Sequence, residues 1–154
     1  MLPQRRHASL VLLSICLLAA ACRPTLPDLL SSELEGETND RAVLEGNTET
    51  QIPLTAADLH GYVTGFRDIT TYARFTVSQL GLSEFLRSTA CPSTLETTDI
   101  RSEIQRAGNF SWWQPGSAID YKWCDGIKEH LVQRVFMDLS DRNNAIVYII
   151  ASTR

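Results

Sequence analysis

Four cysteines are the residues of this 154-residue chain whose chemistry is easiest to anticipate. Cys16 and Cys22 lie in an apolar segment at the start, and Cys91 and Cys124 lie further along the chain. Outside the cytoplasm a lone pair of cysteines most simply forms a disulfide, while two buried thiols or a metal-binding pair stay open as alternatives. We therefore expect Cys91 and Cys124 to be bonded. The closed loop of about 33 residues would contribute about 3.7 kcal/mol through chain entropy.

Five aromatic residues gather in one segment that holds all three tryptophans of the chain: Phe110, Trp112, Trp113, Tyr121 and Trp123. On an exposed loop such side chains suit stacking on a sugar or contact with a protein. The structural alternative is that one indole fills the open end of a small core while the other lies beneath the loop. Because adjacent side chains of an extended segment point to opposite sides, at least one of Trp112 and Trp113 is expected to be exposed. The candidate binding residues are Trp112, Trp113, Tyr121 and Trp123.

Other patterns typical of catalysis or metal binding are missing from the sequence. His60 and His130 are the only histidines after the apolar start, and neither has the spacing of a metal site. There is no Cys-x-x-Cys pair, no Gly-x-Ser-x-Gly motif, no phosphate-binding loop and no dinucleotide motif. The sequence therefore predicts no metal, no cofactor and no identifiable catalytic residue. A Ser-His-Asp triad assembled from distant positions stays open.

The first residues have the pattern of an export signal. Arg5 and Arg6 precede an apolar run from Ala8 onward, which ends in three alanines and Cys22. The run to Ala21 is about 14 residues long, shorter than the ~20 apolar residues that a transmembrane helix needs. One interpretation is that the signal ends at Cys22, which is then modified. Two alternatives stay open: plain secretion after cleavage at the alanines, or an apolar segment that is retained as a membrane anchor.

The residues Ala19-Ala20-Ala21-Cys22 resemble the lipobox of bacterial lipoproteins, with Ala19 where the strongest lipoboxes have Leu. The resemblance implies that the signal peptide, residues 1–21, is removed and that Cys22 receives acyl chains such as palmitate. The partner of Cys22 is then the lipid bilayer, and the protein belongs to the cell envelope, on the extracytoplasmic face of a bacterial membrane. The later segments 52–87 and 112–115 and the final hairpin look like uncharacterised exported bacterial domains, which implies no activity.

The acidic residues are concentrated before the expected domain. The chain has a net charge of −4, and Asp and Glu outnumber Arg between Cys22 and Gln51, where no aromatic residue occurs. Such a segment buries too little apolar surface to fold. We therefore expect residues 22–51 to be the lipidated cysteine and an acidic flexible tether, with a segment that folds on contact with a partner as the alternative. Residues 52–154 are close to neutral, which argues against nucleic-acid binding.

Residues 52–154 have the composition of a single folded domain. Alternating apolar residues, caps and turn residues predict its elements. In order these are strands at 60–66 and 70–78, helices at 79–87 and 99–107, a long ordered loop at 109–126, and strands at 131–139 and 145–151. Ser78 is expected to cap the first helix, with Ser83 as the alternative cap, and Gly108 is expected to end the second. The prediction is an α+β domain: a small antiparallel sheet of two hairpins, with one or two helices on one face.

Two functions follow from these residues as hypotheses. The first is a non-enzymatic binding or structural module of the envelope, which meets a protein or glycan through the tryptophan-rich loop. The second is a small extracytoplasmic hydrolase with an unrecognised polar site. In an enzyme, His60 or His130 should lie with other polar residues in one cleft, whereas a binding module should have a tryptophan-lined surface.

Overall fold

Six antiparallel strands form one sheet in residues 35–154, the part of the chain that the computed structural model describes. The strand order is β1-β2-β3-β6-β5-β4. The elements are β1 (Gly36–Thr38), α1 (Arg41–Thr48), β2 (Ala57–Thr64), β3 (Thr70–Ser78), α2 (Gln79–Leu86), α3 (Arg101–Ala107), the 3-10 turn η1 (Pro115–Ser117), β4 (Tyr121–Lys128), β5 (Leu131–Asp138) and β6 (Asn144–Thr153). The α+β class is confirmed.

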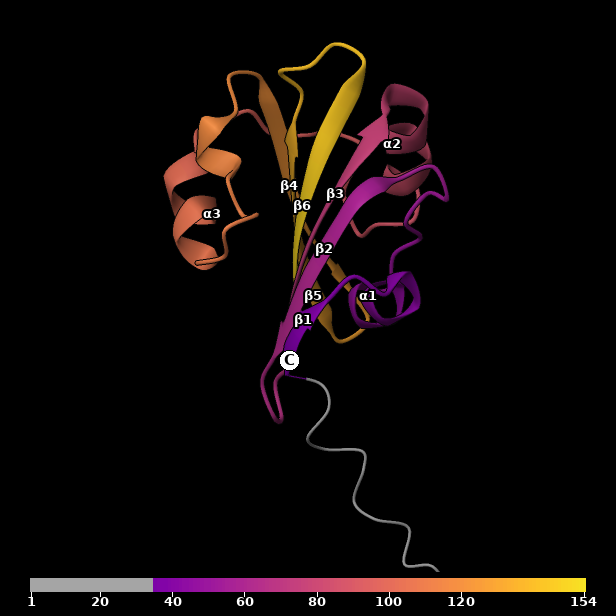
Figure 1. Ribbon diagram of the computed structural model, residues 1–154, viewed down its shortest axis with the longest axis vertical. Coiled ribbons are helices and arrows are strands. Elements are labelled where there is room, and N and C mark those ends of the chain that lie inside the picture. Colours follow the sequence, from indigo (N-terminus) through magenta and orange to yellow (C-terminus); the bar gives the residue numbers. More distant parts are fainter. Residues whose placement is uncertain (1–34) are drawn as a thin grey trace, which may run out of the picture. The chain divides into compact units, whose positions relative to one another are not determined.

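The sheet is larger than predicted, and helices lie on both of its faces. The two predicted hairpins, β2–β3 and β5–β6, are present and join through a long pairing of β3 with β6. Strand β1 adds to one edge and β4 to the other. Figure 1 shows α1 and α2 on one side of the sheet and α3 on the other. The prediction of two hairpins with helices on one face alone is therefore wrong.

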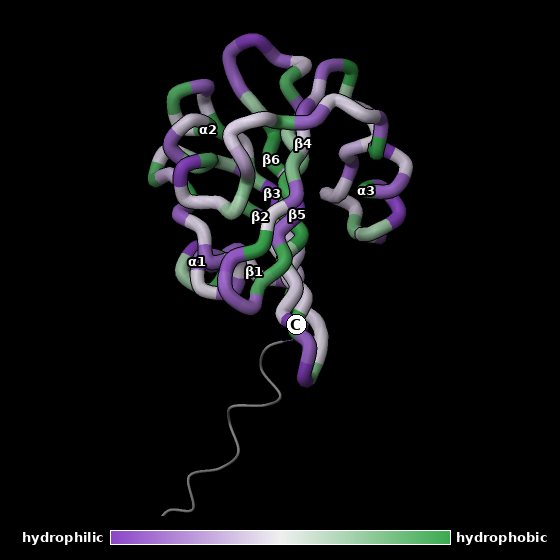
Figure 2. Tube along the Cα trace, turned by 180° about the vertical axis from the view of Figure 1, so that it is seen from behind, coloured by the Kyte–Doolittle hydropathy of each residue, from purple (hydrophilic) through white to green (hydrophobic). Residues whose placement is uncertain are grey.

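Each face of the sheet has its own hydrophobic core. The first core contains α1 and α2, with Leu44 and Phe85 fully buried against Phe75 of β3. The second core lies under α3 and the tryptophan-rich loop and includes Trp113 and Tyr148. Strand β6 serves both cores, which explains its nearly continuous apolar run. Figure 2 shows the same distribution, with hydrophobic residues along the strands and hydrophilic residues along much of the loops.

The folded domain begins before the predicted boundary at residue 52. Residues 36–38 form β1, which pairs with β2, and α1 follows directly. Asp40 caps α1, because its side chain accepts a hydrogen bond from the backbone N–H of Ala42 at 2.9 Å. The Arg41 guanidinium donates to the carbonyl oxygens of Ile52 and Pro53 at 2.7 and 2.6 Å. Residues 36–51 are therefore not tether. The predicted signal peptide, Cys22 and the rest of the tether lie outside the described residues.

The caps were predicted correctly, but one loop was not. The Ser78 hydroxyl accepts a hydrogen bond from the N–H of Gly81 at 3.3 Å, and α3 ends before Gly108 as expected. The predicted loop at 109–126 is wrong at its end, because Tyr121–Lys128 form β4 and pair along their whole length with β5. The true loop is residues 108–120.

The segment between α2 and α3, residues 87–100, passes along the edge strand β4 from one face of the sheet to the other. Cys91 and Cys124 form a disulfide across this path, with their Cα atoms 5.5 Å apart, as predicted. The backbone N–H of Ala90 donates to the side chain of Gln133 at 2.7 Å. Further along, Glu96 forms a two-way backbone bridge with Trp123. The disulfide is therefore one of several contacts that fix this crossing segment on the sheet.

Loss of the Cys91–Cys124 bond should weaken the domain measurably. We expect reduction, or the double change Cys91→Ser with Cys124→Ser, to lower the free energy of unfolding by about 2–4 kcal/mol. Thermal unfolding of the purified protein followed by circular dichroism measures the change, and the oxidised protein is the control. Rapid reaction of both thiols with a thiol reagent in the folded protein would contradict the bond.

Candidate functional site

Two of the four candidate binding residues are core residues. Trp113 is fully buried, and its indole N–H donates to the carbonyl oxygen of Ile104 at 2.8 Å. Trp123 is 9% exposed, and its indole N–H donates to the carbonyl oxygen of Thr98 at 2.9 Å. These contacts satisfy the polar atom of each ring and hold α3 and the crossing segment on the second core. Both indoles therefore have a structural role.

The other two candidates, Trp112 and Tyr121, are half-buried. They lie at different places on the face of the sheet that carries α3, which we call the second face. Tyr121 stacks on Phe136 with 5.4 Å between ring centroids, and the Arg101 guanidinium lies 5.0 Å from the tyrosine ring. Hydrogen bonds from Arg101 also lower the pKa of the Asp99 carboxyl to about 2. Tyr121 is thus already covered by Arg101, so Trp112 is the candidate with the better access to a partner.

Trp112 belongs to a row of stacked aromatic rings. Its indole is nearly parallel to the Phe110 ring at 4.9 Å and to the His60 imidazole at 5.6 Å. Phe110 in turn contacts Tyr62 and Tyr72 of β2 and β3. The expected divergence of the adjacent tryptophans is found, because Trp113 points into the core while Trp112 lies at its border. The row fixes the position of Trp112 on the sheet.

A hollow of about 250 Å³ lies beside this row, and we call it the Trp112 hollow. It is lined by Glu37, Thr38, Asn39, His60, Gly61 and Trp112. Three segments contribute: β1 with the turn after it, β2, and the tryptophan-rich loop. The sequence indicated Trp112 and His60 separately, but nothing in it predicted that β1 would bring Glu37 and Asn39 to them.

The β1 side of the Trp112 hollow is acidic. Glu35, Glu37 and Asp40 are exposed on β1 and on the two sides of it. Arg41 is occupied with the backbone carbonyls of residues 52 and 53, and Arg74 of β3 is paired with His60 on the opposite side of the hollow from β1. Beneath the aromatic row, burial raises the pKa of the Tyr72 phenol, which stays neutral at physiological pH. The hollow thus combines the Glu37 carboxylate with an indole, which suits a basic side chain whose charge pairs with the carboxylate and whose apolar stem contacts the ring.

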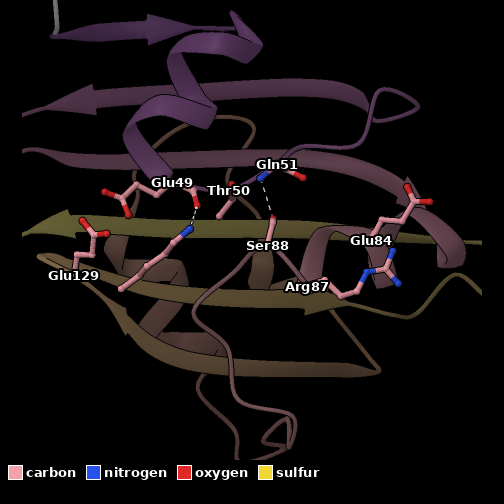
Figure 3. A pocket seen from close by; sticks show the side chains of 8 residues that line it. Glu49, Thr50, Gln51, Glu84, Arg87, Ser88 and Glu129 are labelled. Carbon is pink, nitrogen blue, oxygen red and sulfur yellow. Dashed lines mark hydrogen bonds between the residues drawn. The ribbon is translucent and has the colours of Figure 1, made fainter.

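A second and larger hollow, of about 840 Å³, lies on the first face of the sheet, the one that carries α1 and α2. We call it the polar groove. Its lining residues come from the ends of α1 and α2 and from the β4–β5 turn: Glu49, Thr50, Gln51, Glu84, Arg87, Ser88, Lys128 and Glu129. Figure 3 shows Glu49 and Glu129 at one end of it and Glu84 with Arg87 at the other. The Ser88 hydroxyl accepts from the N–H of Gln51 and donates to the carbonyl of Phe85. Ser88 is therefore engaged in the fold.

At one end of the polar groove, Glu49, Glu129 and His130 each offer a donor atom, and these atoms lie within 4.8 Å of one another. The imidazole Nε2 of His130 is 3.8 Å from a carboxylate oxygen of Glu49. Sequence spacing did not reveal this group, because Glu49 is far from the other two in the chain. Glu129 and His130 are exposed, and the Lys128 ammonium binds the backbone carbonyl of Glu49 at 2.9 Å. Open solvent and a neighbouring cation both weaken metal binding here.

The two histidines therefore do not meet in one cleft. His60 stacks on Trp112 in one hollow, and His130 lies at the end of the other, beside Glu49. Comparison with known proteins gave no match to a protein-family model, to a curated protein or to a solved structure. Among the helices of residues 35–154, none has the length and apolar character needed to cross a bilayer.

The adjacent tryptophans should respond very differently to truncation. Trp113→Ala is expected to cost about 3–5 kcal/mol of stability, because it empties a fully buried site and leaves the Ile104 carbonyl unpaired. Trp112→Ala removes a half-buried ring at the border and should cost clearly less. Urea unfolding of the two variants compares them directly, and equal losses would contradict the assignment of Trp113 to the core and Trp112 to the surface.

Proposed function

We propose that this protein is a lipid-anchored module of a bacterial cell envelope that binds a partner protein. Two observations support the location. The residues Ala19 to Cys22 have the form of a lipobox, and the domain contains the disulfide Cys91–Cys124. Disulfides of this kind persist in oxidising compartments, where an exported protein would fold.

The Trp112 hollow is the proposed partner site, and its chemistry is the observation that carries the proposal. Trp112, His60, Asn39 and Glu37 line this small space, so an indole, an imidazole, an amide and a carboxylate lie close together. A lysine or arginine of the partner gains charge attraction to Glu37 and lays the apolar stem of its side chain against the indole. The partner is accordingly a protein with a protruding basic side chain.

The aromatic row favours a protein over a glycan. A pyranose ring stacks on a free aromatic face, but Phe110 and His60 already stack against the indole of Trp112. A hydrolase is less well supported, because His60 is held in that stack and the Ser88 hydroxyl has partners within the fold. Binding of a basic side chain beside Glu37 needs neither a free ring face nor a nucleophile.

The anchor can be tested by one substitution. Cys22→Ala should prevent lipidation and move the protein from the membrane fraction to the soluble fraction. The acyl chains add about 0.8 kcal/mol of membrane affinity for each buried CH₂, and this contribution is lost entirely. Fractionation with a high-salt wash, together with mass measurement of the N-terminal peptide, checks the result. A Cys22→Ala protein that stays with the membrane would refute the lipid anchor.

The partner site can be tested in living cells by a photo-cross-linking amino acid at Asn39, which lines the hollow. We expect a discrete protein adduct that is lost when Glu37→Lys reverses the charge and retained in Glu37→Asp. The same cross-linker at Asn143, in the β5–β6 turn, is the matched control and should give no such adduct. An adduct that survives Glu37→Lys, or cross-linking to glycan alone, would contradict the proposal.

A further inference from the structure

Phe66 is the aromatic residue among the large hydrophobic side chains exposed in residues 35–154, with 80% of its surface accessible. It lies in the connection between β2 and β3, residues 65–69, which we call the β2–β3 tip. Both views of the molecule show this connection projecting at one end of the sheet (Figure 1, Figure 2). A largely exposed phenylalanine at a projecting position is costly to leave in water, since most of its apolar area is not covered by the fold.

The base of the β2–β3 tip is held firmly. Gly65 has a φ of 108°, and a side chain there would overlap the carbonyl oxygen of Asp68. The N–H of Ile69 donates to the Thr153 hydroxyl at 2.8 Å, and the carbonyl of Ile69 accepts from the N–H of Thr153 at 3.0 Å. These contacts tie the tip to the end of β6. Phe66 is therefore presented outward by a tight, hydrogen-bonded turn.

The same end of the sheet receives the chain from its anchor. Gly36, the first residue of β1, pairs with Val63, close to the start of the tip. Because β1 begins at Gly36, at most residues 23–35 lie between Cys22 and this strand. A chain of that length spans at most about 45 Å. If Cys22 is in the bilayer, this end of the domain stays within that distance of it.

The residues around Phe66 match the chemistry of a membrane interface. Arg67 follows directly, and Arg154 ends the chain just after the Thr153 that contacts the tip. An aromatic ring that enters the acyl boundary, with arginines at the level of the headgroups, is typical of interfacial contacts. Asp68 and Glu35, whose carboxylate accepts a hydrogen bond from the Thr64 hydroxyl beside the tip, offset this charge, so burial of the ring and not electrostatic attraction is the main contribution.

We propose that the β2–β3 tip inserts Phe66 into the interface of the phospholipid bilayer that holds Cys22. The inference rests on the proposed lipidation of Cys22. One phenylalanine binds a membrane weakly by itself, but a short tether raises its effective concentration at the surface to the millimolar range. Two contacts, the acyl chains and the tip, then fix the orientation of the domain, with the β1 end toward the bilayer and the β5–β6 turn away from it.

The test uses the lipidated full-length protein in vesicles of phosphatidylethanolamine and phosphatidylglycerol. An environment-sensitive fluorophore at Asp68→Cys reports on the tip while leaving Phe66 in place, and the same fluorophore at Asn143→Cys reports on the opposite end. We expect a several-fold rise in emission at residue 68 on reconstitution, quenching by lipids that carry a shallow spin label, and no change at residue 143.

Two further variants make the result decisive. Phe66→Asp should abolish the rise at residue 68 without changing thermal unfolding, because the ring makes few contacts in the fold. The Cys22→Ala protein added to the same vesicles should give no rise, because it lacks the acyl chains that hold the domain at the surface. A fully lipidated protein whose residue 68 responds no more than residue 143, or whose response survives Phe66→Asp, would overturn the inference while leaving the anchor intact. A chain with unmodified Cys22 would instead refute the proposed function.

Discussion

The passage of the chain from one face of the sheet to the other, at the edge of β4, is the constraint on which the rest of the domain depends. Gln133 is fully buried there, and its amide both accepts from the N–H of Ala90 and donates to the carbonyl of Thr48 at 2.6 Å. Gly126 lies opposite, and a side chain on it would overlap the backbone of Ala90. A buried amide with both groups satisfied stabilises a single arrangement, since any other leaves them unpaired. The disulfide beside it limits the same segment in the unfolded chain.

This crossing determines which elements cover the second face of the sheet. Once residues 87–100 are fixed along β4, α3 must lie over the opposite face from α2, and the loop that follows must return across β6 and β3. Trp113 fills the space beneath it, leaving its neighbour Trp112 at the border near β2. The Trp112 hollow therefore exists because the second core ends there. The aromatic residues of the hollow are placed by the packing of the second core. Its polar residues Glu37, Thr38 and Asn39 come from β1 and the turn after it.

The sequence predicted the elements whose signals are local. Alternation marked β3 and β5, Ser78 marked the start of α2, and the lone cysteine pair marked the disulfide. It failed for β1 and α1, since a three-residue strand has no period and a mostly polar helix buries little beyond Leu44 and Thr48. The sequence pattern did not reveal β4, because both faces of this strand are buried: Trp123 lies in the second core and Cys124 in the first. Two adjacent buried residues break the alternation. The Trp112 hollow arises from the pairing of β1 with β2, a contact that no local pattern encodes.

Strand β1 links the two proposed roles of the protein physically. It has only three paired residues, all with β2, yet it follows directly on the segment from Cys22 and also supplies Glu37 to the hollow. So short an edge strand is among the parts of a domain that open most readily. A partner that contacts Glu37 on β1 and His60 on β2 binds only when the two strands are paired. By mass action, its binding free energy stabilises that pairing. Occupation of the hollow would thus strengthen the pairing of the strand that leads to the proposed anchor at Cys22.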